Sequence, residues 1–391
     1  MIILYLFSVL WQEDVKGRFK QAIKARWVYP FLLLFFIHAI SLIWSEDFQT
    51  GWFVVEKKAS LLAVPMLIAM DSHVNRNLLH HALFSLIIGC FTALWICLGY
   101  SLWQFVRVED PALFFYHNFS WPLDEFNATY LSLYTFISLV SLNYLSGSVE
   151  YSPLHRPWIR GLLIATFLGG ILLLSSKLFI VLTACYLVFL LIRQLRERMH
   201  FNQAVFVWSL GLTALLGGVL LPGYIWKRFD QIMRSQFEVI HQDQFQWDSP
   251  FNGLTLRMLF LRFGWGILAE NKALISGVGV GDAQEKINGM IRRHNLYHGN
   301  PSLGNTGYLG YNFHNQYMEF WVQTGLLGLL SWIWVIVHGW QKGIFIGWHS
   351  PLVYLAIAIA LFAFSEGFME RQRGIVFTVY FLSIFHSTVR K

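Results

Sequence analysis

The sequence is poor in charged residues, which make up only 13% of its 391 positions. A soluble domain is about one quarter charged, so these few charges could not cover the surface of a water-soluble protein of this size. A lipid bilayer removes that requirement, and 56% of the residues are hydrophobic. The net charge of +7 is typical of membrane proteins that retain Lys and Arg on the cytoplasmic side. The composition therefore predicts a polytopic membrane protein with the bilayer as a partner and no nucleic acid.

Cysteine is equally scarce. The three cysteines, Cys90, Cys97 and Cys185, all lie inside apolar stretches, which favours packing over disulfides or metal ligation. No stretch has the ligand spacing of a structural zinc site. The first ten residues lack the positive n-region and the cleavage site of a signal peptide. We therefore expect no disulfide framework, no structural metal and no cleaved signal peptide.

Long apolar stretches dominate the chain, and a helix needs about 20 residues to cross the hydrocarbon core. A partial first segment, 1–11, is too short to span. The full candidates are 28–44, 57–70, 79–106, 127–145, 158–174, 178–192, 204–221, 317–338, 350–365 and 373–388. The predicted fold is an all-α polytopic membrane protein with about eleven transmembrane segments, the first one partial.

Loop charge predicts the orientation. If the basic segment 12–27 is cytoplasmic, alternation places thirteen Lys and Arg on that side and three on the other, as the positive-inside rule requires. The chain then divides into N-terminal helices (1–221), a large periplasmic loop with amphipathic helices (222–316) and C-terminal helices (317–391). Residue 1 would start within the membrane, so we expect a further helix before it. A loop of this length is typical of a functional segment.

Two helices are expected in the first half of this loop. Apolar residues at three- and four-residue spacing over 223–245 predict an amphipathic helix, which either lies in the membrane interface or packs on the rest of the loop. A second helix, starting near residue 254, is apolar except for Arg257 and Arg262. These arginines point about 140° apart on a helix, so they do not share a face. An arginine in such a setting binds an anion or a carboxylate, or reaches out to water.

A glycine-rich segment follows, with Gly277, Gly279, Gly281 and Asp282 in the pattern G-x-G-x-G-D. A nucleotide-binding loop would need a final glycine and a preceding strand. The pattern therefore favours a turn at which the backbone approaches another element closely.

Histidines in the second half of the loop suggest two kinds of site. His294 and His298 are four residues apart, but Gly299 interrupts any helix there and no glutamate accompanies the pair, so a metal site is disfavoured. His314 stands where the loop re-enters the membrane, just ahead of an apolar helix. From the residues alone, a structural and a catalytic role for His314 both remain open.

Taken together, residues 257–330 resemble the shared domain of the O-antigen ligase and O-antigen polymerase superfamily. The resemblance rests on an arginine on a helix that contains a tryptophan, on G-V-G-V-G-D, and above all on F-H-N-Q-Y-M-E-F-W-V-Q-T-G-L-L-G-L-L over 313–330. The topology also agrees, because the family has about twelve helices and one large periplasmic loop before the last helices.

The resemblance implies a GT-C-like glycosyltransferase that needs no metal or other cofactor and uses a glycan carried on undecaprenyl pyrophosphate. By this resemblance His314 is the catalytic base, and Arg257 and Lys177 bind the donor pyrophosphate. The family has an S-R motif where this chain has Ser175-Ser176-Lys177, and lysine keeps the charge but loses the bidentate fork. Supporting roles are expected for Asn315, Arg262, Arg292, Arg293 and Asp282, with Gly277, Gly279 and Gly281 shaping the loop.

Several functions are compatible with these features. The first is a ligase that moves the glycan onto a hydroxyl of lipid A core at the periplasmic face of the bacterial inner membrane, with inversion. The second is an O-antigen or exopolysaccharide polymerase, and a related one is an oligosaccharyltransferase acting on protein. A transporter or flippase for the lipid-linked glycan would require charged residues along mid-membrane segments, whereas charge here gathers at helix ends and in the loop.

Overall fold

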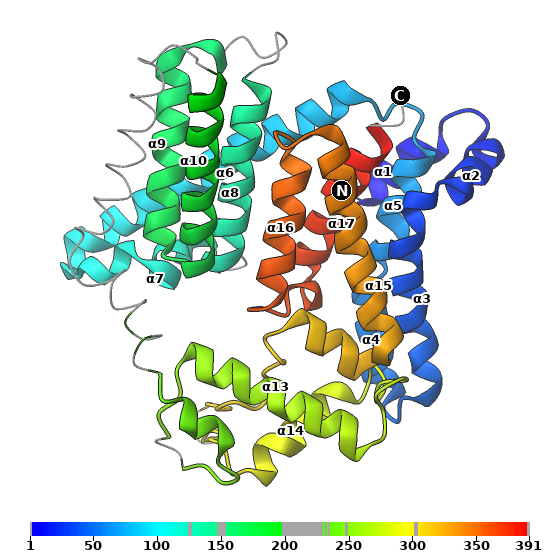
Figure 1. Cartoon of the computed structure of the whole chain (residues 1–391), viewed down its shortest axis with the longest axis vertical. Coiled ribbons are helices and arrows are strands. Elements are labelled where there is room, and N and C mark those ends of the chain that lie inside the picture. The colour runs from blue at the N-terminus through cyan, green and yellow to red at the C-terminus, as the bar shows by residue number, and fades with distance from the viewer. Residues whose placement is uncertain are drawn as a thin grey trace. The chain divides into compact units, whose positions relative to one another are not determined.

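The computed structural model describes residues 2–123, 127–146, 154–197, 235–246, 249–300 and 304–388, together with 230 and 233 (Figure 1). Every regular element in these residues is a helix. The α-helices are α1 (Ile2–Leu10), α2 (Val15–Lys24), α3 (Tyr29–Ser41), α4 (Phe48–Lys57), α5 (Ser60–Met70), α6 (Arg76–Val108), α7 (Tyr116–Ser120), α8 (Ala128–Leu145), α9 (Pro157–Leu174), α10 (Lys177–Glu197), α13 (Gly253–Glu270), α14 (Ala283–Arg293), α15 (Gln316–Ile346), α16 (Pro351–Ala363) and α17 (Gln372–Thr388). Short 3-10 helices include η1 (Arg26–Val28), η2 (Leu42–Trp44), η6 (Phe237–His241) and η8 (Phe368–Glu370).

Five helical segments of the described chain are long and apolar enough to cross a membrane. They are Arg26–Trp44, Arg76–Val108, Pro157–Leu174, Lys177–Gln194 and Gln316–Ile346, and Pro351–Ala363 is a shorter apolar helix. The protein is therefore an all-helical, multi-pass membrane protein. The larger number of about eleven segments stays a prediction, and the stretch 204–221 lies outside the described residues.

Helix boundaries follow local chemistry. Helix α9 begins at Pro157, where the missing amide proton costs nothing because a first-turn N–H has no partner within the helix. It ends at Ser175, whose left-handed φ of 49° stops the helix and allows α10 to start at Lys177. The predicted segments 158–174 and 178–192 thus correspond to two helices joined by a two-residue turn.

The chain forms two compact units. One comprises residues 1–76, 234–348 and 359–391, and the other comprises 77–233 and 349–358. In the second unit, α8 packs against α9 and α10 and is buried almost all round. Its buried hydroxyls Ser132, Thr135 and Ser138 donate to the carbonyl four residues earlier, which satisfies them in apolar surroundings.

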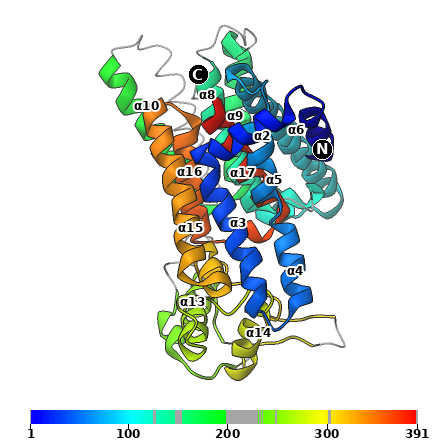
Figure 2. The same ribbon diagram turned by 90° about the vertical axis from the view of Figure 1, so that its right-hand side faces the viewer.

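In the first unit, α3 packs along α15 and α5 packs along α17. Helices α13 and α14 lie at one end of these upright helices, and the basic α2 lies at the other end (Figures 1 and 2). That the loop and segment 12–27 occupy opposite sides of a membrane stays a prediction.

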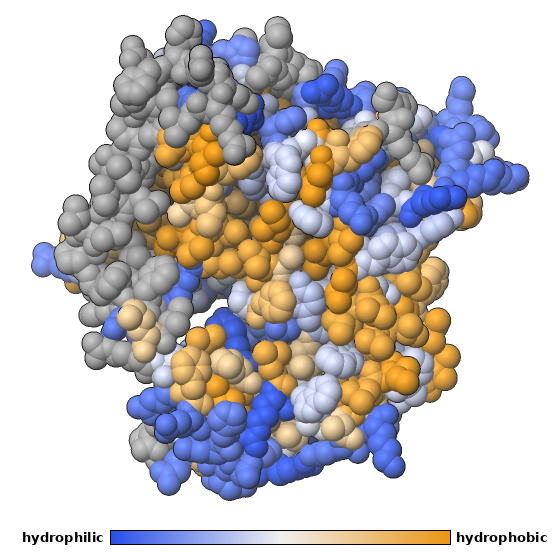
Figure 3. Space-filling model, in the orientation of Figure 1, coloured by the Kyte–Doolittle hydropathy of each residue, from blue (hydrophilic) through white to orange (hydrophobic). Residues whose placement is uncertain are grey.

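The surface of the upright helices in this unit is apolar, and both ends are hydrophilic (Figure 3). Large hydrophobic side chains exposed on this band include Leu33, Phe36 and Ile40 of α3 and Phe53 of α4. A band of this kind is what a bilayer would cover.

The described part of the loop has a hydrophobic core of its own, which includes Phe260 and Phe263 of α13 and Ile287 and Ile291 of α14. Residues 223–229 of the predicted amphipathic helix, 223–245, lie outside the described residues. Over 237–245 the prediction of an α-helix is wrong, because the chain forms only the short η6 there. The Arg262 guanidinium donates to the carbonyls of Ile240 and Gln242. In a continuing helix these carbonyls would accept from backbone amides instead.

Candidate functional site

Arg257 lies in the second turn of α13. The helix starts at a reciprocal capping box between Asn252 and Thr255, which sets the orientation of this turn. The Nε of Arg257 donates to the carbonyl of Ser365 at 2.7 Å, and another guanidinium nitrogen donates to the carbonyl of Gly253. Among the described residues, no ion pair joins this guanidinium to a carboxylate within 4.0 Å. Arg257 is therefore a cation whose neighbours are neutral carbonyls.

His314 is the penultimate residue before α15 and has a left-handed φ of 47°. That conformation is uncommon for a residue other than glycine and tends to occur at functional sites. Its amide donates to Oδ1 of Asn312 at 2.9 Å. The imidazole lies parallel to Phe260 of α13, with 6.2 Å between ring centroids, and edge-on to Tyr311 at 5.5 Å. The ring is thus held on both sides.

Asn315 caps α15. Its Oδ1 accepts from the amide of Met318 at 2.9 Å, and its Nδ2 donates to the carbonyl of Phe364 at 3.2 Å. Phe364 and Ser365 belong to the connection that follows α16. The predicted site residues Arg257, His314 and Asn315, from two separate segments of the sequence, therefore meet at one short connection, 364–367.

The same connection contributes an acidic residue that the sequence reasoning did not single out. Oε2 of Glu366 lies 3.6 Å from Nδ1 of His314, and the two side chains are 21% and 25% exposed. Glu366 is one of two carboxylates in S-E-G-F-M-E-R, residues 365–371. Its place between two apolar stretches is the only signal that could have drawn attention to it.

A buried ion pair between Lys58 and Glu370 lies close to the connection 364–367. Nζ of Lys58 lies 2.8 Å and 2.9 Å from the two carboxylate oxygens of Glu370, and the Lys58 side chain is 1% exposed. The side chain of Gln316 also contacts the pair. Its Nε2 donates to Glu370 at 3.3 Å, and its Oε1 accepts from the backbone amide of Met369 at 2.7 Å. Burial disfavours the charged form of Glu370, but Lys58 outweighs this effect and lowers the pKa of the carboxyl.

Glu319 connects this interior to the loop that carries His314. Its Oε2 accepts from the amide of Phe313 at 3.2 Å, and its Oε1 accepts from Nε2 of Gln323 at 2.8 Å. Glu319 therefore holds backbone next to His314, whereas the Glu370 carboxylate binds the side chains of Lys58 and Gln316. Neither Glu319 nor Glu370 was predicted as a site residue.

The glycine segment after α13 approaches other backbone closely. Val278 and Gly279 donate to the carbonyls of Val322 and Gln323 in α15. A Cβ at Gly277 would lie 2.5 Å from the amide nitrogen of Gly325, and Gly277 has a φ of 71°. The segment meets α15 where Gly325, with a φ of 70°, breaks the helix geometry.

Asp282, the last residue of the G-x-G-x-G-D pattern, is 7% exposed. Its carboxylate accepts from the backbone amides of Glu46 and Asp47, both at 2.9 Å. These amides precede α4, so Asp282 fastens the loop to the turn between α3 and α4. The glycine segment contacts protein backbone on both sides, which is the arrangement expected of a close-approach turn.

The other predicted arginines have carboxylate partners. Arg262 pairs with Asp243 at 2.6 Å, and Arg293 binds both carboxylate oxygens of Glu270. Arg292 pairs with Glu285 and lowers the pKa of that carboxyl. The structure thus places Arg262, Arg292 and Arg293 in ion pairs within the loop, and Arg257 beside the connection.

Lys177 is the first residue of α10, directly after Ser175 and Ser176, which are both buried. It belongs to the unit formed by residues 77–233 and 349–358, whereas Arg257 and His314 belong to the other unit. The role of Lys177 in donor binding therefore stays a proposal.

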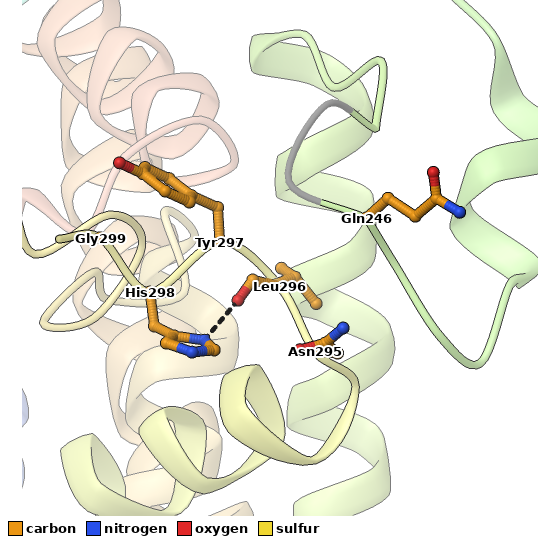
Figure 4. Close-up of a pocket in the computed structure, with 6 residues that line it drawn as sticks. All are labelled: Gln246, Asn295, Leu296, Tyr297, His298 and Gly299. Carbon is orange, nitrogen blue, oxygen red and sulfur yellow. Dashed lines mark hydrogen bonds between the residues drawn. The ribbon is translucent and has the colours of Figure 1, made fainter.

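A pocket of about 440 Å³ lies on the loop, lined by Gln246, Asn295, Leu296, Tyr297, His298 and Gly299 (Figure 4). Nδ1 of His298 lies 2.8 Å from the carbonyl of Leu296, and Nδ1 of His294 lies 2.7 Å from the carbonyl of Asp243. The two histidines thus have different backbone partners. Gln246 and Tyr297 point away from each other (Figure 4).

A bundle of apolar helices that carries a histidine, an arginine and a carboxylate at one end defines a membrane-embedded protein with a polar site at its surface. Residues 161–333, a little under half of the chain, match the family model described as O-antigen ligase. The match supports a glycosyltransferase-like membrane protein of the ligase and polymerase type. A comparison with curated proteins gives no match. The matched range contains Lys177, Arg257 and His314 but ends before Glu366 and Glu370.

Proposed function

We propose that this protein transfers a glycan from undecaprenyl pyrophosphate to an acceptor hydroxyl at the periplasmic face of the bacterial inner membrane, as an O-antigen ligase does. The observation that carries the proposal is the meeting of Arg257 and His314 at the connection 364–367. A proton acceptor and a cation at one place are what glycosyl transfer from a pyrophosphate requires.

The chemistry follows from these two groups. The acceptor hydroxyl attacks the anomeric carbon and gives its proton to the imidazole of His314, while the bond from that carbon to the phosphate oxygen breaks. The pyrophosphate leaves with the bonding electrons, and its growing negative charge is stabilised by the Arg257 guanidinium and, in this proposal, by Lys177. Attack opposite the leaving group inverts the anomeric centre. The proposed reaction uses no metal.

The buried charges of the first unit support a transferase over a transporter. A path for a charged substrate would place ionisable residues along the middle of spanning helices. Lys58 lies between α4 and α5, Glu319 lies in the first turn of α15, and Glu370 lies in η8. These three charged residues lie at helix ends and in connections, where they support the candidate site.

The test is transfer by purified protein supplied with an undecaprenyl-pyrophosphate glycan and an acceptor, without nucleotide or ion gradient. We expect release of undecaprenyl pyrophosphate, its loss in His314→Ala, and a reduced rate in Arg257→Lys because lysine cannot replace the guanidinium fork. His241→Ala is the matched control, since His241 is an exposed histidine of the same loop. Binding of the donor without turnover would contradict the proposal, and a fully active His314→Ala would remove the base.

The nature of the acceptor can be tested in the same assay. Lipid A core as the acceptor is our proposal, and a second carrier-linked glycan is the competing acceptor that a polymerase would use. Product that migrates with lipid A core supports the ligase, whereas longer carrier-linked glycan identifies a polymerase.

A further inference from the structure

The imidazole of His314 has one buried nitrogen without a hydrogen-bond partner. Nδ1 has no exposed surface and makes no hydrogen bond, yet a quarter of the side chain is exposed. The exposed quarter therefore belongs to the rest of the side chain, and Nε2 is not among the buried nitrogens without a partner. A buried polar atom without a partner is costly, and Oε2 of Glu366, 3.6 Å away, is the carboxylate oxygen placed to satisfy it.

The backbone around Glu366 is held firmly. The carbonyl of Ser365 accepts from Arg257 and the carbonyl of Phe364 accepts from Asn315. The amide of Glu366 donates to the carbonyl of Phe362 at 3.0 Å. Three hydrogen bonds thus fix three consecutive residues, so only a side-chain rotation is needed to shorten the contact to His314.

The residue after Glu366 is constrained as well. A Cβ at Gly367 would lie 2.6 Å from Nδ2 of Asn312, and Oδ1 of the same Asn312 accepts from the amide of His314. Asn312 therefore contacts both Gly367, the residue after Glu366, and His314.

We propose that Glu366 is a positioning residue for His314. Its carboxylate accepts the Nδ1 proton, so that Nε2 carries the lone pair that takes the proton of the acceptor hydroxyl. After that transfer both ring nitrogens carry a proton, and the carboxylate stabilises the imidazolium cation. This inference rests on the proposed function. Contacts of this type are often long before the substrate binds and shorten in the complex, and a carboxylate that orients a histidine in this way is a recurring arrangement.

The kinetic test compares Glu366→Gln, Glu366→Asp and Glu366→Ala in the transfer assay. Replacing the orienting carboxylate of a Ser-His-Asp triad by its amide lowers kcat by about 10⁴-fold, so we expect a fall of up to that size in Glu366→Gln with little change in KM for the donor. Glu366→Asp should recover part of the rate, because it keeps the charge. Glu56→Gln, an exposed glutamate in α4, is the matched control and should not change the rate.

A second readout needs no substrate and is independent of the proposed function. With ¹⁵N-labelled histidine, the His314 signals are identified by their loss in His314→Ala, and their chemical shifts at alkaline pH report which nitrogen carries the proton. We expect the Nδ1–H form in the wild type and a mixture or the Nε2–H form in Glu366→Ala. This shift is not expected from a purely structural defect elsewhere.

The outcomes separate the two proposals. An inactive His314→Ala together with a fully active Glu366→Gln would overturn the role of Glu366 alone. An Nε2–H form in the wild type would overturn it as well, whatever the protein catalyses. An Nδ1–H form that depends on Glu366, together with an active His314→Ala, would leave the pairing intact and refute the proposed base.

Discussion

Breaking the buried pair of Lys58 and Glu370 with a single substitution should strongly destabilise the fold, because one buried charge is left without its partner. In Lys58→Met the carboxylate of Glu370 loses Lys58 and keeps only the 3.3 Å hydrogen bond from Gln316. The substitution lies in the protein interior, because the Lys58 side chain is 1% exposed. Removal of one member of a buried pair costs about 3–5 kcal/mol. That cost corresponds to a change of about 10²–10³-fold or more in the ratio of folded to unfolded protein.

The assay is reversible unfolding by SDS titration in mixed micelles, followed by tryptophan fluorescence. The double variant Lys58→Met/Glu370→Gln should recover most of the loss, because it leaves no unpaired charge and keeps an amide beside Gln316. Lys57→Met is the matched control: Lys57 is only partly buried and lies over the ring of Phe53, so we expect a cost below about 1 kcal/mol. A Lys58→Met variant as stable as the control, or a double variant as unstable as the single one, would refute the reasoning.

The same pair predicts the direction of a pH effect. Burial favours the neutral form of Glu370, but Lys58 outweighs burial and the folded-state pKa lies below the ordinary value of 4.5. A lowered pKa means that the stabilisation is fully present above about 4.5 and is lost as the pH falls through the folded-state value. The stability difference between the wild type and the double variant should therefore shrink below that pH. A difference that grows with acidification would contradict the assignment.

Three further predictions concern the glycine segment and the donor site. Gly279→Ala should destabilise the fold by about 1–3 kcal/mol, because φ is 103° and the new Cβ would lie 2.5 Å from Oγ of Ser45; Gly289→Ala, a helical position with open space, should be neutral or stabilising in the same titration. Asp282→Asn keeps one acceptor oxygen for two backbone amides and should cost about 1–3 kcal/mol; an unchanged unfolding midpoint would count against this. Lys177→Ala should weaken donor use in the transfer assay while Lys177→Arg is tolerated, and equal rates for both would argue against a phosphate contact.

Helices could be predicted from the sequence because a spanning segment needs about 20 consecutive apolar residues, a signal that is local. The predicted stretch 158–174 differs from α9 by one residue, and 79–106 lies within α6, Arg76–Val108. The break at Gly325 was not predicted, because the apolar stretch expected to span the membrane, 317–338, runs across it. The glycine itself is tolerated in helices, so its left-handed conformation has no local signal.

The candidate site was predicted only where a motif marks it. His314 and Asn315 stand in a recognisable run, and Arg257 stands out on an apolar helix. Glu366 does not, since it meets His314 across 52 residues, and Lys58 meets Glu370 across 312 residues. Such pairs arise from tertiary packing, and no spacing in a single sequence predicts them.

The break at Gly325 has a consequence for how the protein can be divided. Residues 316–324 are helical like the rest of α15, but the carbonyls of Val322 and Gln323 accept from the amides of Val278 and Gly279. Just after the break, the amide of Leu326 donates to the carbonyl of Ile275. These first turns also carry Glu319, which accepts from the amide of Phe313 next to His314, and Gln323, which donates to Glu319. A fragment intended to reproduce the loop would therefore have to run through at least residue 326, because a cut at 316 would remove the residues of α15 that bond segment 274–279. The contacts of the loop thus extend past the predicted boundary at residue 316 and into α15.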